Sequence, residues 1–180
     1  MVDHISVPLE RVGVIIGSKG GVKELIEEKS TASLEINSNT GSIHITSAKD
    51  PIKAMQAIEV IQAIGRGFSP EKALQLFDDE LLMLDVVDLS NIANTQKNLK
   101  RIKGRIIGKN GKTREIIESL TNAKISVYGK TVSIIGYPVQ VQIVRTAIQM
   151  LADGAPHSSV YKYLEKKRQE TKVIQSEYNL

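Results

Sequence analysis

The sequence predicts an α+β fold made of two related domains and a basic helical tail. One motif, an isoleucine pair followed by a Gly-x-x-Gly loop, occurs twice, at residues 15–20 and 106–111. Around each copy, apolar residues repeat with the period of a strand, then of two helices, then of two strands, then of a helix. Each domain is therefore expected to have the order strand, helix, helix, strand, strand, helix.

The two copies align around the loop with an offset of 91 (108 − 17). The pairs that are identical at this offset are Ile15 and Ile106, Ile16 and Ile107, Gly17 and Gly108, Gly20 and Gly111, Glu24 and Glu115, Ile26 and Ile117, Glu27 and Glu118. Two copies are too few for a solenoid, which needs about three or more repeats. We expect a first domain, a linker helix, a second domain and a tail, at residues 1–68, 69–80, 81–154 and 155–180.

The first domain is expected to open with a strand, because Ile5, Val7 and Leu9 alternate with polar residues. A short apolar helix over residues 11–16 follows and ends at Gly17, where glycine can adopt a left-handed cap without steric penalty.

Beyond the first loop, the pattern continues with one helix and a pair of strands. The expected elements are a helix at 22–29, a strand at 34–36, a turn at 39–41 and a return strand at 43–45. The pair Asp50-Pro51 is typical of an N-cap followed by proline at the first helical position, and it begins a helix that stops at residues 65–67. Ser69-Pro70 repeats this signal for the linker helix.

The second domain repeats the pattern. Its expected elements are a strand at 82–86, a looser helical entry at 90–99, the loop and its helix at 108–120, strands at 125–127 and 132–134 around a Gly129-Lys130 turn, and a helix at 138–151. The tail has sparse apolar positions among basic ones, so we expect it to be partly helical and too polar to fold alone.

Charge distinguishes the two halves of the chain. Residues 1–80 hold 8 Lys/Arg and 12 Asp/Glu, a balance of −4, and residues 81–180 hold 16 and 8, a balance of +8. The stretch 97–114 carries eight basic residues and no acidic one, and it contains the second loop. A charge run is usually a solvated surface, but one that brackets a Gly-x-x-Gly loop favours binding to a polyanion.

A Gly-x-x-Gly loop between two helices suits a nucleic-acid backbone. Glycine lacks Cβ, so a sugar-phosphate chain can approach closely. The loop ends at a helix N-terminus, where free N–H groups and the positive end of the dipole favour a phosphate. The two middle residues point outward, and Ser18-Lys19 and Lys109-Asn110 each supply a cation.

This element order, with Ile-Ile-Gly-x-x-Gly at the helix junction, resembles the type I KH domain. In that family the loop clamps about four single-stranded nucleotides, and the bases lie between the second helix and the second strand. The resemblance implies that Ile107, Ile116, Ile125 and Val127 line or support this groove; ordinary core packing is the alternative. Two Phe, five Tyr and no Trp are too few for an aromatic stacking platform of another RNA-binding fold.

The loop, the basic run and the KH resemblance give a set of candidate RNA-binding residues. In the second domain these are Arg101, Lys103, Arg105, Ile107, Gly108, Lys109, Asn110, Gly111, Lys112, Arg114 and Lys124. In the first domain, where weaker binding is expected, they are Gly17, Ser18, Lys19 and Gly20. The acidic balance of the first half favours a protein-facing or weak RNA role for that domain.

The whole chain is similar to one KH family, the small-subunit ribosome-assembly factors known as the partner of Nob One. The resemblance rests on residues 65–74, 104–113 and 154–161, of which the first and third lie outside the generic KH pattern. The compact length resembles archaeal members. The family implies binding near the 3′ end of small-subunit rRNA, assistance to the endonuclease that trims it, and contact with a translation initiation factor.

Other chemistries find little support in the sequence. Gly111-Lys112-Thr113 resembles the end of a P-loop, but that motif needs glycine at position 106, which is Ile. The three histidines are scattered, zero cysteines exclude thiolate ligands, and no cluster has metal-ligand spacing. We therefore expect no enzyme activity, cofactor, metal or membrane association, and a cytoplasmic location. A KH-based protein-interaction scaffold and a general KH RNA-binding regulator remain the alternatives.

Overall fold

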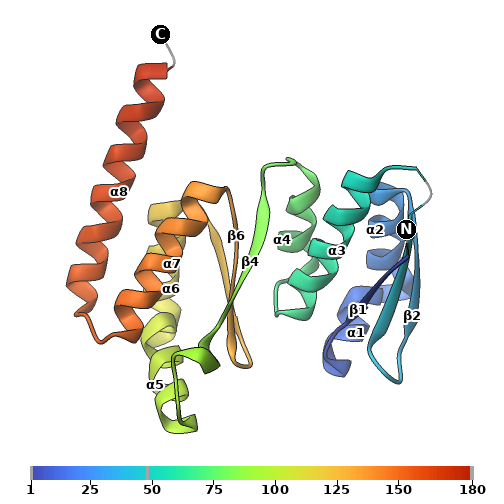
Figure 1. Ribbon diagram of the computed structural model, residues 1–180, viewed down its shortest axis with the longest axis horizontal. Coiled ribbons are helices and arrows are strands. Elements are labelled where there is room, and N and C mark those ends of the chain that lie inside the picture. Colours follow the sequence, from blue (N-terminus) through green and yellow to red (C-terminus); the bar gives the residue numbers. More distant parts are fainter. Residues whose placement is uncertain (1, 48, 179–180) are drawn as a thin grey trace. The chain divides into compact units, whose positions relative to one another are not determined.

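The computed structural model describes residues 2–47 and 49–178. It divides into two compact units, Met1–Leu84 and Asp85–Leu180. Figure 1 shows that each unit combines a small sheet with helices, so the predicted α+β class is confirmed. In the described part of the chain, every helix is too short or too polar to cross a lipid bilayer.

The first unit follows the predicted order. Its elements are β1 (Val2–Ser6), α1 (Leu9–Ile16), α2 (Gly21–Ser30), β2 (Ala32–Asn37), β3 (Ser42–Ser47), α3 (Pro51–Gly65) and α4 (Pro70–Leu74). The strands form an antiparallel sheet in the order β1-β3-β2. The expected extension of the first strand to Leu9 is wrong: Pro8 has no N–H for the ladder, and Leu9 is already the first residue of α1.

The core of the first unit lies where α1, α2 and α3 cover one face of the sheet. Leu34 and Ile36 alternate with exposed residues along β2, and Leu34 pairs with Ile45 of β3. The fully or almost fully buried apolar residues include Val12, Ile15, Ile26, Leu34, Ile43, Ile45, Ala57, Val60, Ile61 and Ile64. Burying these side chains fixes α2, and with it the loop that precedes α2.

The linker helix packs within the first unit. Ala73 of α4 and Leu76 of the following 3₁₀ turn are completely buried. The Gln56 side-chain amide of α3 donates to the Leu76 carbonyl at 3.1 Å. The segment after α3 therefore packs on α3 and extends the core of the first unit.

Arg11 joins the first helix to the end of α3. Its Nε donates to the Ile64 carbonyl at 2.8 Å, and one terminal nitrogen donates to the Phe68 carbonyl at 2.9 Å. Both carbonyls lie at the turn between α3 and α4, where Gly67 has φ +97°. The Ile64 carbonyl also accepts from Gly67 N–H at 3.1 Å, so Arg11 adds a second donor there and connects α1 to the turn after α3.

Replacing Arg11 by methionine should destabilise the first unit by about 2 kcal/mol, because hydrogen bonds from a charged group contribute about 1.5–3 kcal/mol. Native-state hydrogen exchange of the α3 amides measures this free energy. Lys29→Met, at an exposed position of α2, is the matched control. Equal protection in the Arg11 and Lys29 variants would contradict the assigned role.

The second unit repeats the same architecture. Its elements are β4 (Met83–Asp88), whose first two residues precede the unit boundary, α5 (Gln96–Ile107), α6 (Lys112–Thr121), β5 (Lys124–Tyr128), β6 (Thr131–Gly136), α7 (Pro138–Ala152) and α8 (His157–Tyr178). The sheet order is β4-β6-β5, and Ile125 pairs with Ile134 across the β5–β6 ladder. A looser helical entry was expected at residues 90–99. The structure has a 3₁₀ turn at Leu89–Asn91 and then α5.

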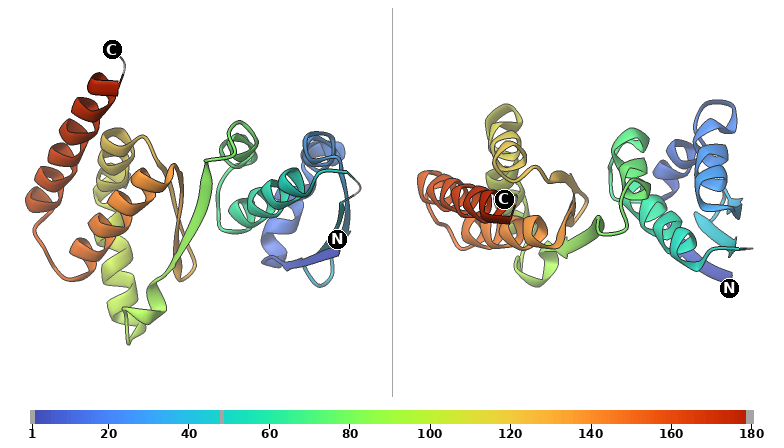
Figure 2. Two further views of the ribbon diagram at one scale, coloured as in Figure 1. Left: turned by 45° about the horizontal axis from the view of Figure 1, so that its top comes forward. Right: turned by 90° about the horizontal axis from the view of Figure 1, so that it is seen from above.

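The predicted helical tail is confirmed, and α8 is a single helix of 22 residues. Val160 and Leu164 are completely buried where the N-terminal half of α8 packs on α6 and α7. Both views in Figure 2 show this half of α8 beside those helices. Val173 and Ile174, further along α8, are exposed. The sparse apolar positions therefore anchor one end of the helix to the second unit.

Candidate nucleic-acid interface

The second Gly-x-x-Gly loop is a tight turn with an unusual backbone. Gly108 follows α5 with φ +73° and ψ +174°, and Lys109–Gly111 form a 3₁₀ turn before α6. Within that turn Asn110 has φ +54° and Gly111 has φ +77°. Gly17, Lys19 and Gly20 have φ +73°, +53° and +78°, so both loops have nearly the same backbone.

The first position of each loop excludes any side chain for steric as well as conformational reasons. A Cβ on Gly108 would lie 2.2 Å from Thr113 Oγ1 and 2.7 Å from Thr113 N. A Cβ on Gly17 would lie 2.4 Å from Val22 Cγ2. The expected left-handed cap is wrong in detail, because ψ near 175° places both residues in an extended positive-φ region that is essentially restricted to glycine.

The middle residues of both loops face solvent. Ser18, Lys19, Lys109 and Asn110 are all exposed. Helix α6 starts at Lys112 without a side-chain hydrogen bond at its N-cap, Gly111. The first-turn N–H groups of this helix can therefore donate to a phosphate oxygen of a backbone that approaches the loop, and the exposed Lys109 adds a cation in the same turn.

Three other basic residues of the predicted set have polar contacts within the second unit. Arg101 donates to Asn98 Oδ1 at 3.1 Å and to the Ala152 carbonyl at 3.4 Å. Arg105 donates to the Ala155 carbonyl, and Lys103 donates to the Gly129 carbonyl at 2.7 Å. The two arginines thus hold the turn between α7 and α8, and Lys103 connects α5 to the β5–β6 turn.

The remaining basic residues of the predicted set lie closer to the loop or on β5. Lys112 is exposed at the start of α6, and Lys124 is half-buried at the start of β5. Arg114 lies beside the loop, since a Cβ on Gly111 would be 3.8 Å from its terminal nitrogen. Arg114 Nε is buried without a hydrogen-bond partner among the described residues.

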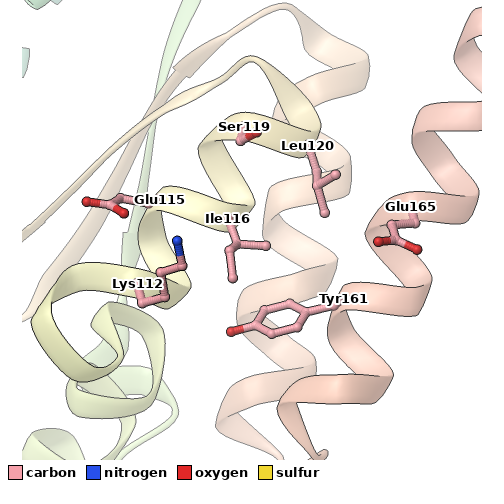
Figure 3. Close-up of a pocket in the computed structure, with 7 residues that line it drawn as sticks. All are labelled: Lys112, Glu115, Ile116, Ser119, Leu120, Tyr161 and Glu165. Carbon is pink, nitrogen blue, oxygen red and sulfur yellow. The ribbon is translucent and has the colours of Figure 1, made fainter.

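The apolar candidates divide between the sheet side and the α8 side of α6. Ile125 is buried in the core, and Ile107 and Val127 are half-buried. Ile116 lines an open groove between α6 and α8, which Figure 3 shows with the Ile116 and Tyr161 side chains facing each other. The other lining residues are Lys112, Glu115, Ser119, Leu120 and Glu165.

Sequence reasoning missed an interaction that fixes the second loop helix to the sheet. Glu118 of α6 accepts a hydrogen bond from the Ile125 backbone N–H at 2.8 Å. The equivalent Glu27 of α2 accepts from Leu34 N–H at 2.7 Å. The identity of this glutamate in both copies was visible in the alignment, but its partner becomes evident only in the fold. It holds the start of β5 or β2 against the helix that follows the loop.

Comparisons with known proteins agree with this geometry. Residues 83–169 match a family model described as a eukaryotic type KH domain (KH-domain type I), the second KH domain of PNO1. Residues 2–62 match the general KH domain model. The chain is 46% identical over 173 residues to the KH domain-containing protein MJ0443 of Methanocaldococcus jannaschii, covering 95% of this chain and 76% of that protein.

This chain belongs to the PNO1 family of KH-domain proteins. It is 28% identical over 137 residues to the pre-rRNA-processing protein pno1 of Schizosaccharomyces pombe, covering 73% of this chain and 57% of that protein. A chain in the crystal structure of the a/eIF2alpha–aDim2p–rRNA complex of Pyrococcus horikoshii is 44% identical, with a TM-score of 0.89. That match covers 94% of this chain and 95% of the other.

The predicted family resemblance is therefore confirmed, and so is the tandem KH architecture. The names of the PNO1 relatives describe RNA-binding and pre-rRNA-processing proteins rather than enzymes. Among residues 2–47 and 49–178, no group of three or more His, Asp or Glu side chains is placed to hold a metal ion.

Proposed function

We propose that this KH protein binds single-stranded rRNA and acts as an assembly factor of the small ribosomal subunit. The observation that carries the proposal is the second Gly-x-x-Gly loop, which presents two exposed residues, Lys109 and Asn110, on a helix N-terminus within the basic half of the chain. This arrangement suits a phosphate backbone and leaves the bases to the neighbouring groove.

The relatives support this proposal. The Schizosaccharomyces pombe relative is named for pre-rRNA processing, and the Pyrococcus horikoshii complex contains rRNA and a/eIF2alpha. We extend it to the finer points: the 3′ region of small-subunit rRNA is the target, the endonuclease that matures this end is assisted, and a translation initiation factor is a protein partner. A cytoplasmic location follows from this role.

Crosslinking the protein to RNA in cells and mapping the contacted sequences tests the target. Enrichment at the 3′ end of small-subunit rRNA is the expected result. The crosslinked peptide of the protein should contain the Gly108–Gly111 loop. Contacts distributed over messenger RNA, without enrichment in rRNA, would instead favour a general KH RNA-binding regulator.

RNA binding should weaken as the salt concentration rises. Binding releases cations that were condensed on the RNA, and a higher concentration of free cations makes that release less favourable. For single strands the slope of log K against log salt is about −0.7 per neutralised phosphate. If the loop and its basic neighbours neutralise about four phosphates, the slope should be near −3. Titration of a fluorescent single-stranded RNA between low and physiological salt measures it, and a flat response would contradict an electrostatic clamp.

A protein-interaction role is the second candidate, and the acidic first half of the chain favours it for the first unit. A pull-down after complete nuclease digestion separates the two possibilities. Partners that survive digestion and depend on the first unit would support this role, and loss of every partner would count against it.

A further inference from the structure

A buried threonine in the first turn of α6, directly after the second loop, contacts the C-terminal helix. Thr113 is 3% exposed, and its Oγ1 lies 3.1 Å from the Tyr161 hydroxyl of α8. The same Oγ1 is the atom that a Cβ on Gly108 would meet at 2.2 Å. Thr113 is therefore enclosed between the first glycine of the loop and a tyrosine of α8.

The start of α8 is held against α5 by two further hydrogen bonds. The Arg105 side chain donates to the Ala155 carbonyl, and the His157 ring nitrogen Nε2 donates to the Arg105 carbonyl at 3.1 Å. Arg105 is three residues before Gly108, so these bonds hold the last turn of α5 as well. The ends of both helices that frame the loop, α5 and α6, thus contact residues 155–161 at the start of α8.

The first unit has a different arrangement at the equivalent position. Val22 occupies the place of Thr113 at the offset of 91 (113 − 22), and its Cγ2 lies 2.4 Å from a Cβ built on Gly17. The first loop is thus packed by an apolar side chain of similar shape, which needs no hydrogen-bond partner. The hydroxyl in the second unit, by contrast, is buried and needs the partner that α8 supplies.

We propose that Tyr161 is a positioning residue for the second RNA-binding loop, and that the first turns of α8 act as a brace for it. This inference rests on the proposed RNA clamp at Gly108–Gly111. The hydroxyl of Tyr161 is connected to the loop through Thr113, and the phenol adds no charge to the site. Its contribution is to hold Thr113, and hence the Gly108 backbone, in the geometry that accepts a phosphate.

The test is the substitution Tyr161→Phe, which removes one hydroxyl and leaves the ring. We expect single-stranded RNA to bind about 3- to 10-fold more weakly, the range that a lost buried hydrogen bond usually gives. The amides of residues 108–112 should exchange faster in the free protein. The salt slope should stay unchanged, because no charge is lost.

A double variant makes the test specific. Combining Thr113→Val with Tyr161→Phe recreates the apolar packing of the first unit and should restore RNA affinity to within about 2-fold of the unmodified protein. Tyr163→Phe, on the same helix, is the matched control and should change neither affinity nor loop exchange. A double variant as weak as Tyr161→Phe alone would overturn the brace, as would a Tyr161→Phe protein with unchanged affinity and loop exchange.

The exchange measurement needs no RNA, so it separates this inference from the proposed function. Faster exchange of the loop in Tyr161→Phe, together with no effect of loop charge on RNA affinity, would support the brace and reject the clamp. Unchanged exchange, with strong dependence on loop charge, would support the clamp and reject the brace.

Discussion

Replacing Lys109 and Asn110 by aspartate should weaken single-stranded RNA binding by about 100-fold or more. Both side chains are exposed in the middle of the second loop. The change removes one cation and places two anions where a phosphate is expected, and one charge-assisted hydrogen bond alone contributes about 1.5–3 kcal/mol. Titration of the 3′-terminal fragment of small-subunit rRNA measures the loss.

The fold of this variant should be intact. Asn110 has φ +54°, a conformation that aspartate also tolerates, and exposed substitutions usually change stability by about 0.5 kcal/mol or less. The matched control is Ser18→Asp with Lys19→Asp, the equivalent positions of the first loop. We expect a smaller loss in the control, since the first half of the chain is acidic. Unchanged affinity in the Lys109/Asn110 variant would reject the second loop as the RNA site.

Substituting Gly108 by alanine should be the most damaging single change in the loop. Its φ and ψ are essentially restricted to glycine, which costs about 1–3 kcal/mol for another residue. The new Cβ would also lie 2.7 Å from Thr113 N, a backbone atom that can move only with α6. We expect a stability loss on the order of 3 kcal/mol in the second unit, and RNA binding at least 10-fold weaker.

Two neighbouring glycines supply graded controls. Gly111→Ala meets only the flexible Arg114 side chain, so its cost should be the left-handed strain of about 1–2 kcal/mol. Gly104→Ala lies within α5 with open space around it and should stabilise the helix by about 0.5–1 kcal/mol. Thermal denaturation ranks the three variants. Equal stability of the Gly108 and Gly104 variants would show that the loop tolerates a side chain.

The sequence predicted most of the fold because its signals are local. The duplicated loop identified two domains, and the apolar periods located helices and strands within a few residues. Errors arose where a local signal was misleading. Leu9 continued an alternation that Pro8 interrupts. The helical tail was predicted, and the structure adds that its buried residues Val160 and Leu164 anchor it to the second unit.

The candidate site was predictable in its backbone but only partly in its side chains. Lys109 and Asn110 are exposed as expected, because side chains in the middle of a tight turn between two helices point away from the core. Arg101 and Arg105 belong to the same basic run, yet their guanidinium groups contact the α7–α8 turn. Sequence spacing cannot assign such contacts, since the partner carbonyls are about 50 residues away along the chain.

The sequence alone therefore determined the repeat, the glycine loops and the unequal charge of the two halves. These properties depend on residue type and on separations of a few positions. Only the tertiary structure decided which basic side chains remain at the loop and which hold helices together. It also decided that Tyr161, about 50 positions beyond the second loop, contacts Thr113 directly behind it. Such contacts depend on how α8 packs on α6, and that packing follows from burial of the whole core.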